Sequence, residues 1–141
     1  MRKARVATVS FGRGPDPQAT LRRALALVQQ AGEGRPDIIA LPEACLNDRR
    51  SAQRVPGPLS ELFAEQARKY QCYVILPIIK EEEDGTLYNV ALLLDPAGQV
   101  VGEYKRCSPP ITRCARASSR VRRHRSLTLP SDASAWPSAS T

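Results

Sequence analysis

The segment Asp37–Glu43, with the sequence DIIALPE, constrains the fold more than any other part of the chain. It begins with a short, mostly apolar run, which is typical of a strand covered on both faces. Pro42 cannot continue the ladder of a central strand, so the strand is predicted to stop there and to leave Glu43 at its carboxyl end. Ligands bind at that end of open α/β sheets, and a carboxylate held against apolar walls can serve as a general base. Glu43 is therefore a candidate catalytic residue, with an ordinary surface glutamate as the alternative.

Local end signals predict two helices. Asp16 offers an N-cap and Pro17 a first helical position, and apolar residues then recur at helical spacing until Gly32, which we take as the stop. The turn Val55–Pro58 precedes a second amphipathic segment, which Pro58 opens.

Five strands are predicted around these helices, over residues 5–11, 37–41, 72–77, 88–94 and 99–104. The acidic run Glu81–Gly85 is predicted to be a solvated hairpin loop, and Asp95–Gly98 a tight turn. The resulting order β-α-β-α-β-β-β indicates an α/β layer structure with a mixed sheet.

Composition narrows the class of protein. The 141 residues suffice for one ordinary domain. No stretch approaches the roughly 20 apolar residues that span a bilayer, and the N-terminus is too polar for a signal peptide. The cysteines show neither metal-site spacing nor a secretory context, so we expect reduced thiols in a cytoplasmic protein. His124 is the only histidine, which excludes a multi-histidine metal site, and we expect no metal and no cofactor.

The net charge of +7 is confined to the end of the chain. Residues 1–104 hold 13 Lys/Arg and 13 Asp/Glu, whereas residues 105–141 hold 8 Lys/Arg and the single acid Asp132. Residues 111–141 are rich in Ser, Arg, Ala and Pro, without the apolar period of a helix or strand, so we expect a disordered tail. It could be a basic arm that binds nucleic acid through phosphates, a neutral extension, or the product of an out-of-frame translation, which we favour.

Four stretches, taken in order, carry a resemblance to a known family. They are the opening strand with its long helix, the run Ile38–Glu43, the second helix with Tyr73–Leu76, and the stretch Leu87–Tyr104. Together they resemble the N-terminal part of the carbon–nitrogen hydrolase (nitrilase/amidase) superfamily, over about residues 4–106. The resemblance implies an αββα sandwich, of which residues 1–110 are expected to form a partial domain.

The resemblance also implies a Glu-Lys-Cys triad. The cysteine thiolate attacks an amide or nitrile carbon, the glutamate accepts and returns protons, and the lysine stabilises the tetrahedral oxyanion. Glu43 matches the family glutamate.

Two basic residues compete for the place of the family lysine, which follows the tyrosine of the fifth strand by two positions. Arg106 occupies that position, and Lys105 stands one residue earlier. A shift of one residue turns a strand side chain to the opposite face, so Lys105 serves only if a local bulge redirects it. Arginine keeps the charge but is larger and does not deprotonate. We take Lys105 as the candidate, with Arg106, or no role for either, as alternatives.

No cysteine has the family's placement in a strand-to-helix elbow. Cys107 directly follows the basic pair, Cys114 lacks a preceding apolar strand, and Cys45 and Cys72 are predicted to be core residues. We therefore expect a truncated carbon–nitrogen hydrolase, catalytically incomplete by itself, whose parent family acts on small-molecule amides or nitriles.

A different class of protein remains as the alternative, a non-catalytic interaction module with a basic nucleic-acid-binding tail. For either class we expect no membrane partner, and self-association through exposed sheet edges is a further expectation.

Overall fold

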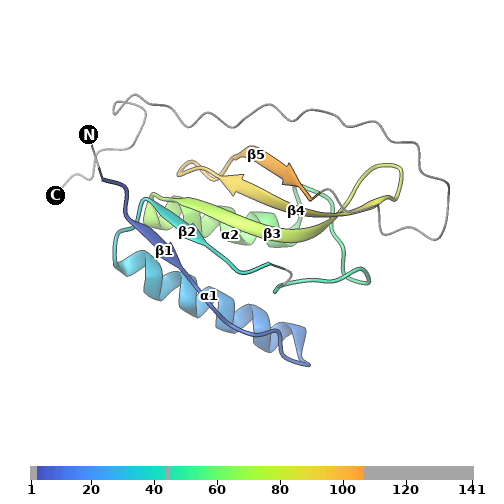
Figure 1. Ribbon diagram of the computed structural model, residues 1–141, viewed down its shortest axis with the longest axis horizontal. Coiled ribbons are helices and arrows are strands. Elements are labelled where there is room, and N and C mark those ends of the chain that lie inside the picture. The colour runs from blue at the N-terminus through green and yellow to red at the C-terminus, as the bar shows by residue number, and fades with distance from the viewer. Residues whose placement is uncertain (1–2, 44, 107–141) are drawn as a thin grey trace.

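The computed structural model describes residues 3–43 and 45–106, and their helices and strands follow the order β-α-β-α-β-β-β (Figure 1). This order confirms the α/β class predicted from the sequence. The elements are β1 Val6–Thr8, α1 Pro17–Glu33, β2 Ile38–Ala40, α2 Pro58–Tyr70, β3 Tyr73–Glu81, β4 Leu87–Leu94 and β5 Val100–Lys105.

The strands form one mixed sheet in the order β1-β2-β3-β4-β5, so each strand lies beside its neighbours in the chain. β1, β2 and β3 are parallel, and helices α1 and α2 make the two crossovers between them. β3, β4 and β5 are antiparallel and are joined by short turns. Parallel strands need such long connections, whereas antiparallel strands do not, and the chain therefore switches from helical crossovers to hairpins after β3.

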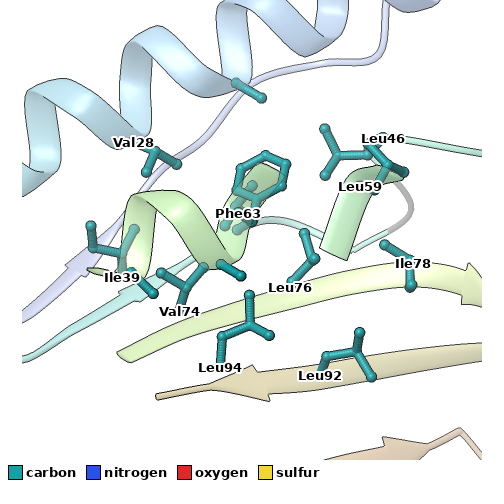
Figure 2. Packing of buried hydrophobic residues seen from close by; sticks show 14 of the residues in the cluster. Val28, Ile39, Leu46, Leu59, Phe63, Val74, Leu76, Ile78, Leu92 and Leu94 are labelled. Atoms are coloured by element: carbon teal, nitrogen blue, oxygen red, sulfur yellow. The ribbon is translucent and has the colours of Figure 1, made fainter. Parts of the chain in front are cut away.

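The hydrophobic core lies between the two helices and one face of the sheet (Figure 2). Val28 of α1 and Phe63 of α2 face Val74, Leu76 and Leu92 of the sheet, and all five residues are fully buried. Burying a side chain of this size contributes about 1.5–3 kcal/mol, so this layer holds the helices in place. Among the residues that the structure describes, no helix covers the opposite face of the sheet.

Helix α1 begins as predicted but ends later. The Asp16 carboxylate accepts a hydrogen bond from the backbone N–H of Gln18 over 2.9 Å, and Pro17 is the first helical residue. The prediction that Gly32 ends the helix is wrong, because α1 continues to Glu33 and is capped by Gly34. A Cβ atom at Gly32 would lie 2.4 Å from Cγ of Tyr70 in α2, so this glycine makes room for the tyrosine ring.

Strand β3 runs to Glu81, four residues beyond the predicted end at Pro77. The main-chain groups of Ile75 and Ile79 face the β2 side, where they accept hydrogen bonds from Leu41 and Gln53. Pro77 lies between these two residues, and its backbone nitrogen faces the same side. The pairing of β2 with β3 ends at Ile75, so Pro77 lies beyond the part of β3 that β2 covers. A proline there removes no ladder hydrogen bond, and the strand passes through it.

The acidic run Glu81–Gly85 is only partly the solvated loop that was predicted. Glu81 belongs to β3, and the turn closes with a hydrogen bond from the Gly85 N–H to the Glu82 carbonyl oxygen over 2.9 Å. The Glu82 carboxylate is engaged in ion pairs with two lysines. The other predicted turn, Asp95–Gly98, is confirmed by a hydrogen bond of 2.8 Å from the Gly98 N–H to the Asp95 carbonyl oxygen.

Several predictions concern residues outside those described. They are the basic tail 111–141, the domain division after residue 110, and the surroundings of Cys107, Cys114 and His124. Within the described ranges, neither helix combines the length and the apolar character that crossing a membrane requires. There, β1 and β5 are the edge strands, with Val6 59% and Val101 49% exposed, and self-association through these edges stays a prediction.

Candidate active site

Glu43 stands where the sequence placed it, just past the carboxyl end of β2. The sheet contact of this segment continues to Leu41, whose N–H donates to the carbonyl oxygen of Ile75 over 3.2 Å. Pro42 follows, and the chain then leaves the ladder. The Glu43 side chain is 58% exposed, so its carboxylate is accessible from solvent.

Two side chains converge on one oxygen of this carboxylate. Asn89 of β4 donates from Nδ2 to Glu43 Oε1 over 2.7 Å. Arg106, the residue after β5, donates from Nη1 to the same oxygen over 2.7 Å. The three residues come from positions 43, 89 and 106 and meet on the side of the sheet that faces away from the helices.

Strand alternation explains why Arg106 reaches Glu43. Val90 lies opposite Lys105 across the β4–β5 ladder, and Val90 is buried beneath the helices. Side chains directly opposite each other share a face, so Lys105 points to the helix-covered face. The next pair, Asn89 and Arg106, points to the other face and is fixed by a hydrogen bond of 3.0 Å from the Arg106 N–H to the Asn89 carbonyl oxygen.

Lys105 belongs to a separate charged cluster. Its Nζ atom contacts Glu82 Oε1, lies 3.8 Å from Glu103 Oε1 and stands 4.6 Å from the centre of the Tyr88 ring. The hydrogen bond between Lys105 and Glu82 raises the pKa of the lysine and lowers the pKa of the glutamate. The one-residue register shift between β4 and β5 at Leu93 and Leu94 lies between the turn and Lys105. Without it, Lys105 would lie opposite Asn89, so the shift turns Lys105 to the helix-covered face and brings Arg106 beside Asn89.

The structure thus brings Glu43 together with Arg106 and with Asn89, while Lys105 contacts other partners. Sequence reasoning raised Arg106 as an alternative and did not single out Asn89. A signal for Asn89 was present, because a polar residue interrupts the apolar pattern of β4 one position before the buried Val90.

The two cysteines in the described residues are unsuited to nucleophilic attack. Cys45 and Cys72 are 3% and 1% exposed, as predicted for core residues, and both are free thiols. Burial raises the pKa of each thiol to about 11, with Asp37 adding to the effect at Cys72. The reactive species is the thiolate, which is scarce at neutral pH when the pKa is this high.

The arrangement around Glu43 has a definite chemical capacity. A solvent-accessible carboxylate can accept a proton from a nucleophile and return it to a leaving group. A neighbouring guanidinium offers fixed positive charge and several N–H donors to a developing oxyanion. In the described parts of the chain, His, Cys, Asp and Glu side chains form no group of three that could hold a metal ion.

The family follows from comparison with known proteins. The sequence model of the carbon–nitrogen hydrolase family matches residues 5–136, and the chain belongs to this family. The match reaches further than the expected residues 4–106 and extends into the segment predicted to be a tail.

Curated relatives include amidases. An omega-amidase of Xenopus tropicalis is 30% identical over 113 residues, which are 75% of this chain and 41% of the relative. A formamidase of Bacillus thuringiensis is 36% identical over 56 residues, 39% of this chain and 17% of the relative. The chain therefore spans less than half the length of these relatives.

Solved structures support the same fold. An N-terminal amidase aligns with a TM-score of 0.65 at 24% identity, over 73% of this chain and 28% of that chain. A carbon–nitrogen hydrolase from Helicobacter pylori G27 aligns with a TM-score of 0.65 at 16% identity, over 77% and 41%. At these identities the likeness concerns the fold alone.

Proposed function

We propose that this chain supplies the proton-transfer base and the anion-stabilising cation of a carbon–nitrogen hydrolase site that acts on a small amide. The observation that carries the proposal is the 2.7 Å contact between Glu43 and Arg106, made by residues 63 positions apart in a chain of this family. The amidase names of the relatives support an amide as the substrate class.

Glu43 is the base in this proposal. It takes the proton of a cysteine thiol as the sulfur attacks the amide carbon, and it returns that proton to the amine that leaves. A water molecule then gives a proton to Glu43 as its oxygen attacks the carbonyl carbon of the thioester. The carbon–sulfur bond breaks, the acid is released, and Glu43 passes the proton to the departing sulfur, which restores the thiol. The exposed position of Glu43 supports this role, because both the thiol and the substrate must reach its carboxylate.

Arg106 is the cation in this proposal, in place of a lysine. Arg106 donates a hydrogen bond to Glu43, whereas Lys105 donates a hydrogen bond to Glu82. A guanidinium keeps its charge at every working pH and can donate two hydrogen bonds to one oxyanion. The earlier candidate, Lys105, stays a prediction that the experiment below distinguishes from Arg106.

The nucleophile is not among the described residues, since Cys45 and Cys72 are buried. We therefore expect the purified 141-residue chain to release no ammonia from simple amides above the buffer rate. Hydrolysis by the chain that is lost on Cys107→Ala or Cys114→Ala would show that it is catalytically complete. The free thiols also support the cytoplasm as its compartment.

A chimeric enzyme tests the roles of Glu43 and Arg106. Residues 5–106 replace the matching segment of the Xenopus omega-amidase, which contributes the remainder of the domain. The chimera is expected to release ammonia from the amide that the relative hydrolyses. Glu43→Gln is expected to lower kcat/KM by about 100-fold or more, because general-base catalysis is worth that much. Arg106→Ala is expected to cause a similar loss, which is typical for a lost oxyanion donor.

Two controls match these variants. Glu33→Gln makes the same chemical change at the end of α1 and is expected to leave kcat/KM within a few-fold. Lys105→Ala removes the neighbouring charge. A larger loss from Lys105→Ala than from Arg106→Ala would assign the cation to Lys105. A folded chimera without activity, or one that keeps its activity after Glu43→Gln, would overturn the proposal.

A further inference from the structure

Asn47 is a buried polar residue whose side chain makes the hydrogen bonds to β3 that a neighbouring strand would make. It is 3% exposed and lies in the loop that follows Glu43. Its Nδ2 donates to the Ile79 carbonyl oxygen over 2.9 Å, and its Oδ1 accepts from the Ile79 N–H over 2.8 Å. A side-chain amide has the same donor and acceptor as a peptide group, so Asn47 completes the edge of β3 beyond the end of β2.

The loop around Asn47 is fastened to β3 on both sides. Before Asn47, the Leu41 N–H donates to the Ile75 carbonyl oxygen over 3.2 Å. After it, the Gln53 N–H donates to the Ile79 carbonyl oxygen over 3.2 Å, and the Gln53 carbonyl oxygen accepts from the Glu81 N–H over 2.9 Å. Along the loop between Leu41 and Gln53, Asn47 makes the hydrogen bonds to β3 found among the described residues, and they end at Ile79, which Gln53 also contacts.

A second set of contacts stiffens the turn that Asn47 opens. Arg13 pairs with Asp48 over 2.7 Å and also reaches the Asn47 carbonyl oxygen at 3.5 Å. The Asp48 carboxylate accepts from the N–H groups of Arg50 and Ser51, which closes the turn. Arg13 and the Ser51 hydroxyl hold the pKa of Asp48 well below its usual range, so the carboxylate stays charged at neutral pH.

The attachment point coincides with the site. Ile79 lies opposite Asn89 across the β3–β4 ladder, and Asn89 is hydrogen-bonded to Arg106 on β4's other side. The residue that Asn47 holds therefore stands in the same row of the sheet as both partners of Glu43. We propose that Asn47 is a positioning residue: by fixing its loop to this row, it sets Glu43 against Asn89 and Arg106. As a role in catalysis, this inference rests on the proposed function.

The test detects the hydrogen bond between Asn89 and Glu43 in the full chain and needs no activity assay. Side-chain amide resonances of Asn89 are recorded by ¹⁵N NMR in the wild type and in Glu43→Gln, and the difference defines the shift caused by the Glu43 carboxylate. In Asn47→Ala, the Asn89 resonances are expected to move to the positions that they have in Glu43→Gln. Adding Glu43→Gln to Asn47→Ala is then expected to cause no further change in these resonances. A structural role confined to the loop would leave the Asn89 resonances at their wild-type positions.

A matched variant separates positioning from loss of stability. Thr20→Val removes another buried polar group, which is 5% exposed and bonded to Asp16 and Gly14. It is expected to lower stability while leaving the Asn89 resonances unchanged. If Asn47→Ala loses the dispersed spectrum of a folded chain, Asn47→Asp replaces it, because it keeps the volume and the acceptor but loses the donor to Ile79. Unchanged Asn89 resonances in the folded Asn47 variant would overturn the proposal. The chimera can fail while this test succeeds, and the reverse also holds.

Discussion

The backbone N–H of Arg106 donates to the carbonyl oxygen of Asn89 over 3.0 Å, immediately after the last residue of β5. This main-chain contact sets the two residues side by side on one face, and both side chains then reach the same oxygen of Glu43. A change of one residue in the pairing of β4 with β5 would present Lys105 in place of Arg106. The identity of the cation at Glu43 is thus decided by strand register.

The ion pair between Arg106 and Glu43 is expected to contribute little to stability. Its side chains are 59% and 58% exposed, and exposed pairs are worth roughly 0–1 kcal/mol. We predict that Arg106→Gln changes the free energy of unfolding by less than about 1 kcal/mol in urea titrations. Lys80→Gln is the comparison, because Lys80 is 14% exposed and contacts Glu103 at 2.7 Å. The prediction fails if Arg106→Gln costs more than Lys80→Gln.

Gly32→Ala is expected to destabilise the chain although alanine is the better helix former. The exchange usually stabilises a helix interior by about 1 kcal/mol. Here the new Cβ would lie 2.4 Å from Tyr70 Cγ, and overpacking of this kind costs about 1–3 kcal/mol. A double-mutant cycle with Tyr70→Ala checks the cause. If Gly32→Ala is equally harmful without the ring, the clash is not the reason.

Stability is expected to fall as the pH rises from about 9 to 11, because of the two buried thiols. Their pKa is about 11 in the folded chain against an ordinary 9.0. In that window the unfolded chain releases these protons while the folded chain keeps them, so deprotonation favours unfolding. Urea titrations at pH 8 and pH 10 measure the loss. The double variant Cys45→Ala, Cys72→Ala should show a smaller loss, and an unchanged one would refute the assignment.

The Glu82 carboxylate is expected to contribute stability that acid removes. Lys105 lowers the pKa of Glu82 below its usual 4.5, so the contribution is present above that value and disappears as the pH falls through the folded-state pKa. Glu82→Gln should therefore cost stability at pH 7 and less at pH 3, by thermal or urea unfolding. Glu83→Gln, an exposed neighbour with the same charge change, serves as the control. An equal cost of Glu82→Gln at both pH values would contradict the prediction.

The parts of the fold that depend on local signals were predicted well. Asp16 caps α1 through a residue two positions away, and Pro58 opens α2 as expected. The strand order along the chain also followed from apolar runs and turns. The predictions at Gly32 and Pro77 were wrong because each residue depends on a part of the chain that is distant in sequence. Gly32 makes room for the Tyr70 ring, and Pro77 is tolerated in β3 because the pairing with β2 ends before it.

The candidate site was predictable in part. Glu43 followed from a strand that ends at a proline, and Arg106 from its position after Tyr104, although Lys105 was preferred. Which of the two side chains contacts Glu43 depends on the register of β4 and β5, which alternation alone does not fix. Asn47 looks like any polar loop residue in the sequence, and its importance emerges only from its two hydrogen bonds to Ile79.

The order of the strands in the sheet has a consequence for how the chain is made. Because the spatial order β1-β2-β3-β4-β5 repeats the order of synthesis, each strand after β1 finds a partner already synthesised as it leaves the ribosome. The sheet can grow by one strand at a time without waiting for a distant segment. Arg106 follows β5, so Glu43 is synthesised early and meets its arginine partner only after β5 has been made.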